Sequence, residues 1–189
     1  MLVLPALGCG SAHERPAAVL TQTGRIGPLR MDVSTGADVI AFAGRPDAER
    51  PGRYSGAAPY RALGYDCSKK RDYGWALEDR TWCKTVFFVN QRTGRLGNFY
   101  TESSRYYERH GVRIGTPTAK AERLLHKLVY VGCEANIELG AMRGLTVAFT
   151  GGRAKRLRGS TDGLHLIGGH VFAFALHGGR SDLGVFDCM

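Results

Sequence analysis

The sequence lacks the short motifs that mark the common enzyme classes. It contains no G-x-S-x-G nucleophile elbow, no G-x-x-x-x-G-K-[ST] phosphate-binding loop, no G-x-G-x-x-G dinucleotide fingerprint and no H-E-x-x-H zinc motif. No two of its five cysteines stand in C-x-x-C spacing, the commonest arrangement of zinc-binding cysteines. We therefore predict no catalytic residue, no cofactor and no metal ligand.

Long apolar runs and acidic residues are also scarce. No apolar run reaches the roughly 20 residues that a membrane-spanning helix needs. The 17 acidic residues stand against 26 Lys and Arg, which gives a net charge of +9. This balance favours polyanions or anionic membrane surfaces as partners, and a basic secreted protein without a charged ligand is an equal interpretation. The 26 glycines, about twice the usual share, predict many turns and short strands.

The clearest structural signal is a helix that begins near residue 117. Thr116 can cap this helix with its hydroxyl oxygen, and Pro117 suits the first helical position because its missing N–H would have no partner there. The apolar residues that follow are spaced so that they share one face of a helix: Ala121, Leu124, Leu125 and Leu128.

A second helix is predicted over residues 35–43. Ser34 or Thr35 stands at its capping position, and Gly44 and Pro46 end it. Its apolar face consists of Val39, Phe42 and Ala43. The following stretch, residues 45–62, contains three prolines and is predicted to be a loop.

Two hairpins are indicated by runs of β-branched and aromatic residues. The first pairs residues 85–90 with 96–101, and Gly94 in the short turn between them can adopt a positive φ. The second pairs residues 145–150 with 171–176, across a long insertion.

The two halves of the chain share one order of elements. Each half has a short strand, a capped helix, a loop, a cysteine and a hairpin. The offset between halves is 83 residues from Met31 to Ile114 and 82 from Val39 to Ala121. Few residues are identical between the halves, so a chance likeness is the alternative to a tandem repeat.

We therefore predict an α+β fold made of two tandem helix-on-antiparallel-sheet units. Each unit alone is too small to be stable, and the two can pair. Residues 1–24 are predicted to be a signal or lipoprotein-like segment with a linker, residues 25–109 the first α+β unit, and residues 110–189 the second.

The first residues predict export. Residues 1–11 contain an apolar run that ends in small residues, as secretory signals do. Ala-Leu-Gly-Cys at 6–9 resembles the lipobox of bacterial lipoproteins, which implies lipidation of Cys9, although Leu7 is atypical of that motif. The basic region that opens such signals is missing, so one expectation is a start upstream of Met1. An unstructured N-terminus is the alternative interpretation.

The remaining four cysteines predict disulfide bonds. Cys67, Cys83, Cys133 and Cys188 allow three pairings. The repeat favours Cys67 with Cys83 and Cys133 with Cys188, because this choice places one bridge in each half. On the chain-entropy estimate the two bridges stabilise the protein by about 3 and about 4 kcal/mol. Disulfides are typical of exported proteins.

Two short motifs resemble a known module. Val-Arg-Ile-Gly-Thr at 112–116 and Ala-Gly-Arg-Pro at 43–46 look like the opening and the ending of a unit found in the β-lactamase inhibitor protein family and in small outer-membrane assembly lipoproteins. Asp32 replaces the opening Gly in the first half, and His126-Lys127 replaces the ending in the second. The resemblance implies a tandem helix-on-sheet fold, a secreted or envelope location and a binding role without catalytic residues.

Two groups of residues are candidates for partner binding. Aromatic residues concentrate between positions 54 and 82, and aromatic residues dominate protein interfaces. Basic residues concentrate in the insertion, where a solvated hairpin extension is the alternative interpretation; Lys69-Lys70-Arg71 is interpreted as a solvated turn. The candidates are Tyr73, Trp75, Trp82, Arg153, Lys155, Arg156 and Arg158.

The sequence thus favours a secreted or envelope-anchored, non-enzymatic module that binds another extracytoplasmic protein. The alternative is binding of a polyanion or a membrane surface through the basic 153–158 stretch. A third interpretation is an uncharacterised hydrolase. Export, and the absence of aromatic residues from the basic stretch, argue against nucleic acid.

Overall fold

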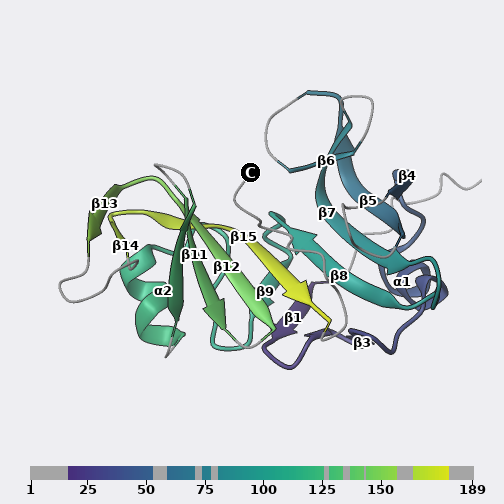
Figure 1. Ribbon diagram of the computed structural model, residues 1–189, viewed down its shortest axis with the longest axis horizontal. Helices are drawn as coiled ribbons and strands as arrows, with labels where there is room; N and C mark the ends of the chain where they lie inside the picture. The colour runs from purple at the N-terminus through teal and green to yellow at the C-terminus, as the bar shows by residue number, and fades with distance from the viewer. Residues whose placement is uncertain are drawn as a thin grey trace, which may run out of the picture.

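The protein folds mainly into β-sheet. The computed structural model describes residues 17–52, 59–70, 74–77, 81–125, 128–133, 137–142, 144–156 and 164–178. These residues contain fifteen strands and two short helices, α1 (Gly36–Ala43) and α2 (Thr118–Leu124) (Figure 1). The strands form a nine-stranded, a four-stranded and a two-stranded sheet.

The nine-stranded sheet runs through both halves of the chain. Eight of its strands lie in the order β10 (Val129–Cys133), β11 (Ile137–Met142), β12 (Leu145–Thr150), β15 (His170–His177), β8 (Leu96–Thr101), β7 (Thr81–Asn90), β5 (Tyr60–Ser68) and β4 (Ala48–Gly52). The ninth strand, β6 (Trp75–Leu77), pairs with β7. All of these neighbours are antiparallel.

The two smaller sheets complete the fold. The four-stranded sheet has the order β3 (Leu29–Arg30), β2 (Arg25–Ile26), β1 (Ala18–Thr21) and β9 (Tyr106–Glu108), with β1 and β9 parallel. The two-stranded sheet pairs β13 (Arg153–Arg156) with β14 (Leu164–Ile167). Figure 1 shows β13 and β14 at one end of the molecule and β4 with α1 at the other.

The predicted α+β fold of two helix-on-sheet units is wrong. Helices of eight and seven residues are only about 10–12 Å long, too short to cover a sheet. The two predicted hairpins do form, as β7–β8 and β12–β15. An isolated hairpin leaves both of its edges unpaired. Here β8 of the first hairpin pairs with β15 of the second, for example with Leu176 opposite Phe99. One edge of each hairpin is thereby hydrogen-bonded, and the two hairpins form a single sheet.

Two of the predicted segment boundaries fall at or between strands of the structure. Residues 18–21, assigned to a linker, form β1 instead, where Leu20 is fully buried. This strand removes residues 18–21 from the predicted linker. The boundary near residue 110 falls between strands of a single hydrogen-bonded sheet, and the division of the chain into units stays a prediction. Cys9, the predicted lipidation residue, lies outside the described residues.

Local signals correctly located the first helix. The Thr35 hydroxyl accepts the N–H of Asp38, and the Asp38 carboxylate accepts the N–H of Thr35 at 2.7 Å, which makes a complete capping box. Gly44 follows the last turn with a φ of 81°, a conformation that suits glycine. The loop predicted for residues 45–62 is wrong in part, because β4 and the start of β5 lie within it.

The cap predicted for the second helix is wrong. The Thr116 hydroxyl accepts the N–H of Arg113 at 2.9 Å and does not cap the helix. Pro117 occupies the capping position, one residue before the first helical residue, Thr118. The apolar face is present but unequal: Ala121 and Leu125 are buried, while Leu124 and Leu128 are partly buried against the same core.

This inequality predicts different costs for two neighbouring leucines. Leu125→Ala should lower the free energy of unfolding by about 2–5 kcal/mol, the usual range for a buried leucine. Leu124→Ala should lower it by less, because that side chain is only partly covered. Urea denaturation of both variants checks this order. Equal losses would show that the two side chains are equally buried in solution.

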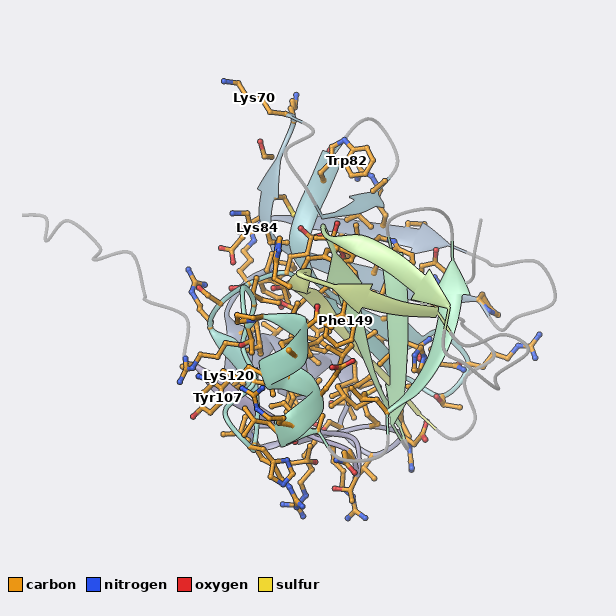
Figure 2. The ribbon with its side chains drawn as sticks, turned by 90° about the vertical axis from the view of Figure 1, so that its left-hand side faces the viewer. Lys70, Trp82, Lys84, Tyr107, Lys120 and Phe149 are labelled. Atoms are coloured by element: carbon orange, nitrogen blue, oxygen red, sulfur yellow. A yellow bond between two sulfur atoms is a disulfide. The ribbon has the colours of Figure 1, made fainter. Side chains whose placement is uncertain are left out.

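The main core lies on one face of the large sheet. Phe87 and Phe99 of the first hairpin and Phe149 and Phe174 of the second meet Leu20 and Ile26 of the four-stranded sheet in one buried cluster. Figure 2 shows Phe149 inside the molecule. The opposite face of the sheet carries a smaller cluster, which includes Val86, Phe88, Tyr100, Ala148, Ala173 and Ala175.

Candidate functional site

A disulfide bond joins β5 to β7, as predicted. Cys67 and Cys83 lie directly opposite each other, and their sulfur atoms are 2.03 Å apart. Gly64 of β5 makes room for the bridge, since a Cβ there would lie 2.5 Å from the Cys83 sulfur. Disulfides persist in oxidising compartments, so this bond is consistent with export. The pairing of Cys133 with Cys188 stays a prediction, because Cys188 lies outside the described residues.

A groove of about 720 Å³ opens beside this disulfide, at the β4 edge of the large sheet. Its lining comes from four places in the sequence: α1, the segment that enters and forms β4, the end of β5 with the residue after it, and the start of β7. The lining residues are Ile40, Arg45, Pro46, Asp47, Ala48, Glu49, Arg50, Cys67, Ser68, Lys69 and Thr81. We refer to this feature as the β4 groove.

Hydrogen bonds hold the two sides of the β4 groove together. The backbone N–H of Asp47 donates to the carbonyl of Gly64 at 2.8 Å, and the Asp47 carboxylate accepts the N–H of Cys67 at 3.3 Å. Glu49 forms an ion pair of 3.4 Å with Arg61 of β5. Both acidic side chains of the lining are therefore engaged with β5.

The β4 groove also presents exposed side chains to solvent. Arg45 and Lys69 are exposed, and neither has a carboxylate partner in the part of the chain that the structure describes. Ile40 is 37% exposed, one of two large apolar side chains that stand out on the surface of the described residues. The β4 groove thus combines two uncompensated cations with an aliphatic side chain.

Two of the predicted aromatic candidates, Trp75 and Trp82, are half-buried on the paired strands β6 and β7. The Trp75 ring packs edge-to-face on Phe88 at 5.2 Å and lies tilted against Tyr100 at 5.4 Å, so it contributes to the smaller core cluster. Trp82 is half-buried on β7, and Figure 2 shows it near the same end of the molecule as Lys70. Tyr73 lies outside the described residues.

The predicted basic stretch is partly a strand. Arg153, Lys155 and Arg156 belong to β13, which pairs with β14 through partners such as Lys155 and His165. Arg158 lies outside the described residues. Figure 1 places this hairpin at the end of the molecule opposite to β4, so the structure does not bring the basic and aromatic candidates together.

A half-buried carboxyl, that of Glu102, follows the end of β8. The Tyr100 hydroxyl donates a hydrogen bond to Glu102, and the backbone N–H of Gly74 donates a second. Burial raises the pKa of Glu102 above its ordinary range, and these hydrogen bonds with the Lys84 charge only partly offset the effect. Burial, with the Glu102 charge, also raises the pKa of Tyr100. The cluster ties the start of β6 to the end of β8.

This arrangement predicts a pH-dependent effect of Glu102→Gln. The folded protein holds the Glu102 proton more tightly than the unfolded chain does. The resulting stabilisation is complete below the ordinary pKa of 4.5 and is lost as the pH rises through the higher folded-state value. Because glutamine does not titrate, the stability of the variant relative to wild type should rise over that range. Urea denaturation at several pH values measures this difference, and a constant difference would contradict the assignment.

The β4 groove was not predicted from the sequence, although some of its features are visible there. Ile40 lies off the buried face of α1, which is made by Val39 and Ala43, so an exposed aliphatic residue was visible in the pattern. Lys69 was predicted to lie in a solvated turn. This prediction agrees with its exposure but did not indicate which residues lie around it. Tyr100 and Glu102 stand two residues apart at the end of a strand, the spacing that places side chains on one face.

Comparisons with known proteins show a shared fold and no family. No family model matches the chain, and no curated protein matches it. The crystal structure of the uncharacterized protein YfeY from Escherichia coli is similar, with a TM-score of 0.53 and 16% identity over 85% of this chain and 99% of that one. The similarity establishes that the two chains have a common fold. The resemblance to the inhibitor and assembly modules stays a prediction.

The described residues contain no group of three or more His, Cys, Asp or Glu side chains placed to hold a metal ion. Neither of their helices has the length and apolar character to cross a membrane.

Proposed function

We propose that this chain is an exported, non-enzymatic binding protein, and that it holds a segment of another extracytoplasmic protein in the β4 groove. The observation that carries the proposal is the composition of the groove, which places the exposed Ile40 among charged side chains. Protein interfaces combine an apolar centre with a polar rim in the same way. The Cys67–Cys83 disulfide supports the oxidising location.

The shape of the β4 groove supports a protein segment as the occupant. The groove is lined along residues 45–50, of which Ala48, Glu49 and Arg50 belong to β4, and successive residues of one segment can contact successive residues of an extended partner. The long arginine and lysine side chains of the groove can reach along such a segment.

The edge of β4 indicates how a partner is held. No strand pairs with its outer side within the described residues. Its exposed residues are Glu49, Arg50 and Pro51, and charged residues and proline on an edge strand oppose unselective strand pairing. We therefore assign recognition to the side chains of the groove and not to the addition of a full strand.

Photo-crosslinking from the groove tests the proposal. A benzophenone amino acid at Ile40, in protein produced in an exporting host, should yield a discrete crosslinked protein that mass spectrometry can identify. The matched control is the same amino acid at Val33, which is 53% exposed and does not line the groove. Substitutions of groove residues should then weaken rebinding of the purified partner. Equal products from both positions would refute the proposal.

The polyanion alternative makes a different prediction for the β13 hairpin. Replacing Arg153, Lys155 and Arg156 by glutamine should leave the Ile40 crosslink intact if the groove binds the partner. Loss of the crosslink in that variant, with a groove that is otherwise unchanged, would favour the polyanion alternative.

A further inference from the structure

We infer that the segment held in the β4 groove is acidic, and that it presents carboxylates to Arg45 and Lys69 and an aliphatic side chain to Ile40. This inference rests on the proposed function and specifies the chemistry of the partner.

The charge balance of the lining is the first argument. Three basic side chains line the β4 groove, Arg45, Arg50 and Lys69, against the two acidic ones, Asp47 and Glu49. The Glu49 charge is offset by the Arg61 guanidinium on β5, while the partner of the Asp47 carboxylate is the neutral Cys67 N–H. The lining still carries one more basic than acidic side chain, and a positive field in a concave site attracts carboxylates.

The register of the sheet provides the second argument. β4 and β5 are antiparallel, with Ala48 opposite Gly64. Past this pair, the Cys67 N–H donates to the Asp47 carboxylate, which keeps the segment that enters β4 in contact with the end of β5. Arg45 and Lys69 each lie two residues along the chain from this hydrogen bond, and both line the groove. Neither has an acidic partner within the described residues.

Ile40 decides between a free anion and a peptide. It projects from α1 with 37% of its surface exposed, while its neighbours Val39 and Ala43 are buried. An inorganic anion would leave this side chain in water. A peptide with an aliphatic residue near its carboxylates would cover Ile40 and neutralise the cations at the same time, which adds apolar burial to the charge contacts.

Synthetic probes test the inference. A short fluorescent peptide of alternating Glu and Leu should bind the wild-type protein, as measured by anisotropy, and the same peptide with Lys in place of Glu should not. A Glu and Gly peptide should bind more weakly than the Glu and Leu peptide. This last difference should shrink in Ile40→Ala, because the variant lacks most of the aliphatic contact.

Charge reversal locates the binding. Arg45→Glu combined with Lys69→Glu should weaken binding of the Glu and Leu peptide by about tenfold or more, since each exposed attraction becomes a repulsion. The matched control is Lys120→Glu with Arg123→Glu on α2, which makes the same change in net charge at the other end of the molecule (Figures 1 and 2). Circular dichroism establishes that both double variants fold.

The outcomes separate the possibilities. Equal weakening by the two double variants would overturn the inference, because binding would then follow net charge. Binding to phosphatidylglycerol vesicles through Arg45 and Lys69, without binding of the peptide, would also overturn it in favour of a lipid surface. If the Ile40 crosslink to a protein persists in Arg45→Glu/Lys69→Glu, the inference fails while the proposed function stands.

Discussion

Phe87→Ala is expected to lower the free energy of unfolding by about 3–5 kcal/mol, the largest single effect that the core predicts. Phe87 is fully buried near the middle of β7. Its ring meets Tyr65 of β5 edge-to-face at 5.6 Å and Phe99 of β8 at 4.9 Å, and Phe99 in turn meets Tyr106 of β9 at 5.1 Å. The chain of rings links the nine-stranded sheet to the four-stranded one.

Urea denaturation followed by circular dichroism measures this loss. The control is Val33→Ala, at an exposed position, which should stay within about 0.5 kcal/mol of wild type. A loss below about 1 kcal/mol for Phe87→Ala would mean that the two sheets do not share this core.

The second large effect is expected from removing the Cys67–Cys83 disulfide. The double variant Cys67→Ala/Cys83→Ala should lose about 3 kcal/mol of stability, because the bridge closes a loop with a sequence separation of 16 residues. The variant should also bind a partner less well, since Cys67 lines the β4 groove. Peptide mapping without reductant checks the pairing in the wild-type protein.

Gly64 provides a second test of the disulfide, because it lies against the Cys83 sulfur. Gly64→Ala should destabilise the disulfide-bonded protein by about 1–3 kcal/mol, because its new Cβ would overlap the Cys83 sulfur. In the Cys67→Ala/Cys83→Ala background the cost should fall, since both sulfur atoms are gone. Additive effects in this cycle would contradict the close approach.

The sequence predicted the features that depend on neighbouring residues. The cap of the first helix, predicted at Ser34 or Thr35 and found at Thr35, and the turn at Gly94 are determined by residues a few positions apart. The hairpin of β7 and β8 follows from the β-forming residues on either side of that turn. The Cys67–Cys83 disulfide was predicted by placing one bridge in each half of the chain, and the structure confirms it although the two-unit fold behind that choice is wrong.

The fold class was wrong because it depends on contacts between distant residues. Nothing in the local pattern states that β8 pairs with β15, about 75 residues further along the chain. The prolines of residues 45–62 indicated a loop, yet β4 accommodates Pro51 because it is an edge strand, where the missing N–H has little effect. A correct pair of hairpins therefore led to an incorrect pair of units.

The candidate site was missed for the same physical reason. Ile40, Arg45 and Lys69 lie in a helix, a connection and a strand end, and only the pairing of β4 with β5 brings them together. Each one looks like an ordinary surface residue in the sequence. The predicted Trp75, by contrast, was an aromatic residue used for packing.

Amide hydrogen exchange of the protein, alone and bound to the partner identified from Ile40, shows whether the partner occupies the β4 groove. Slower exchange is expected in residues 45–50 and 67–69 of the complex, with α2 and the β13–β14 hairpin unchanged. Slower exchange confined to α2 or to the β13–β14 hairpin, with residues 45–50 and 67–69 unaffected, would show that the partner binds elsewhere.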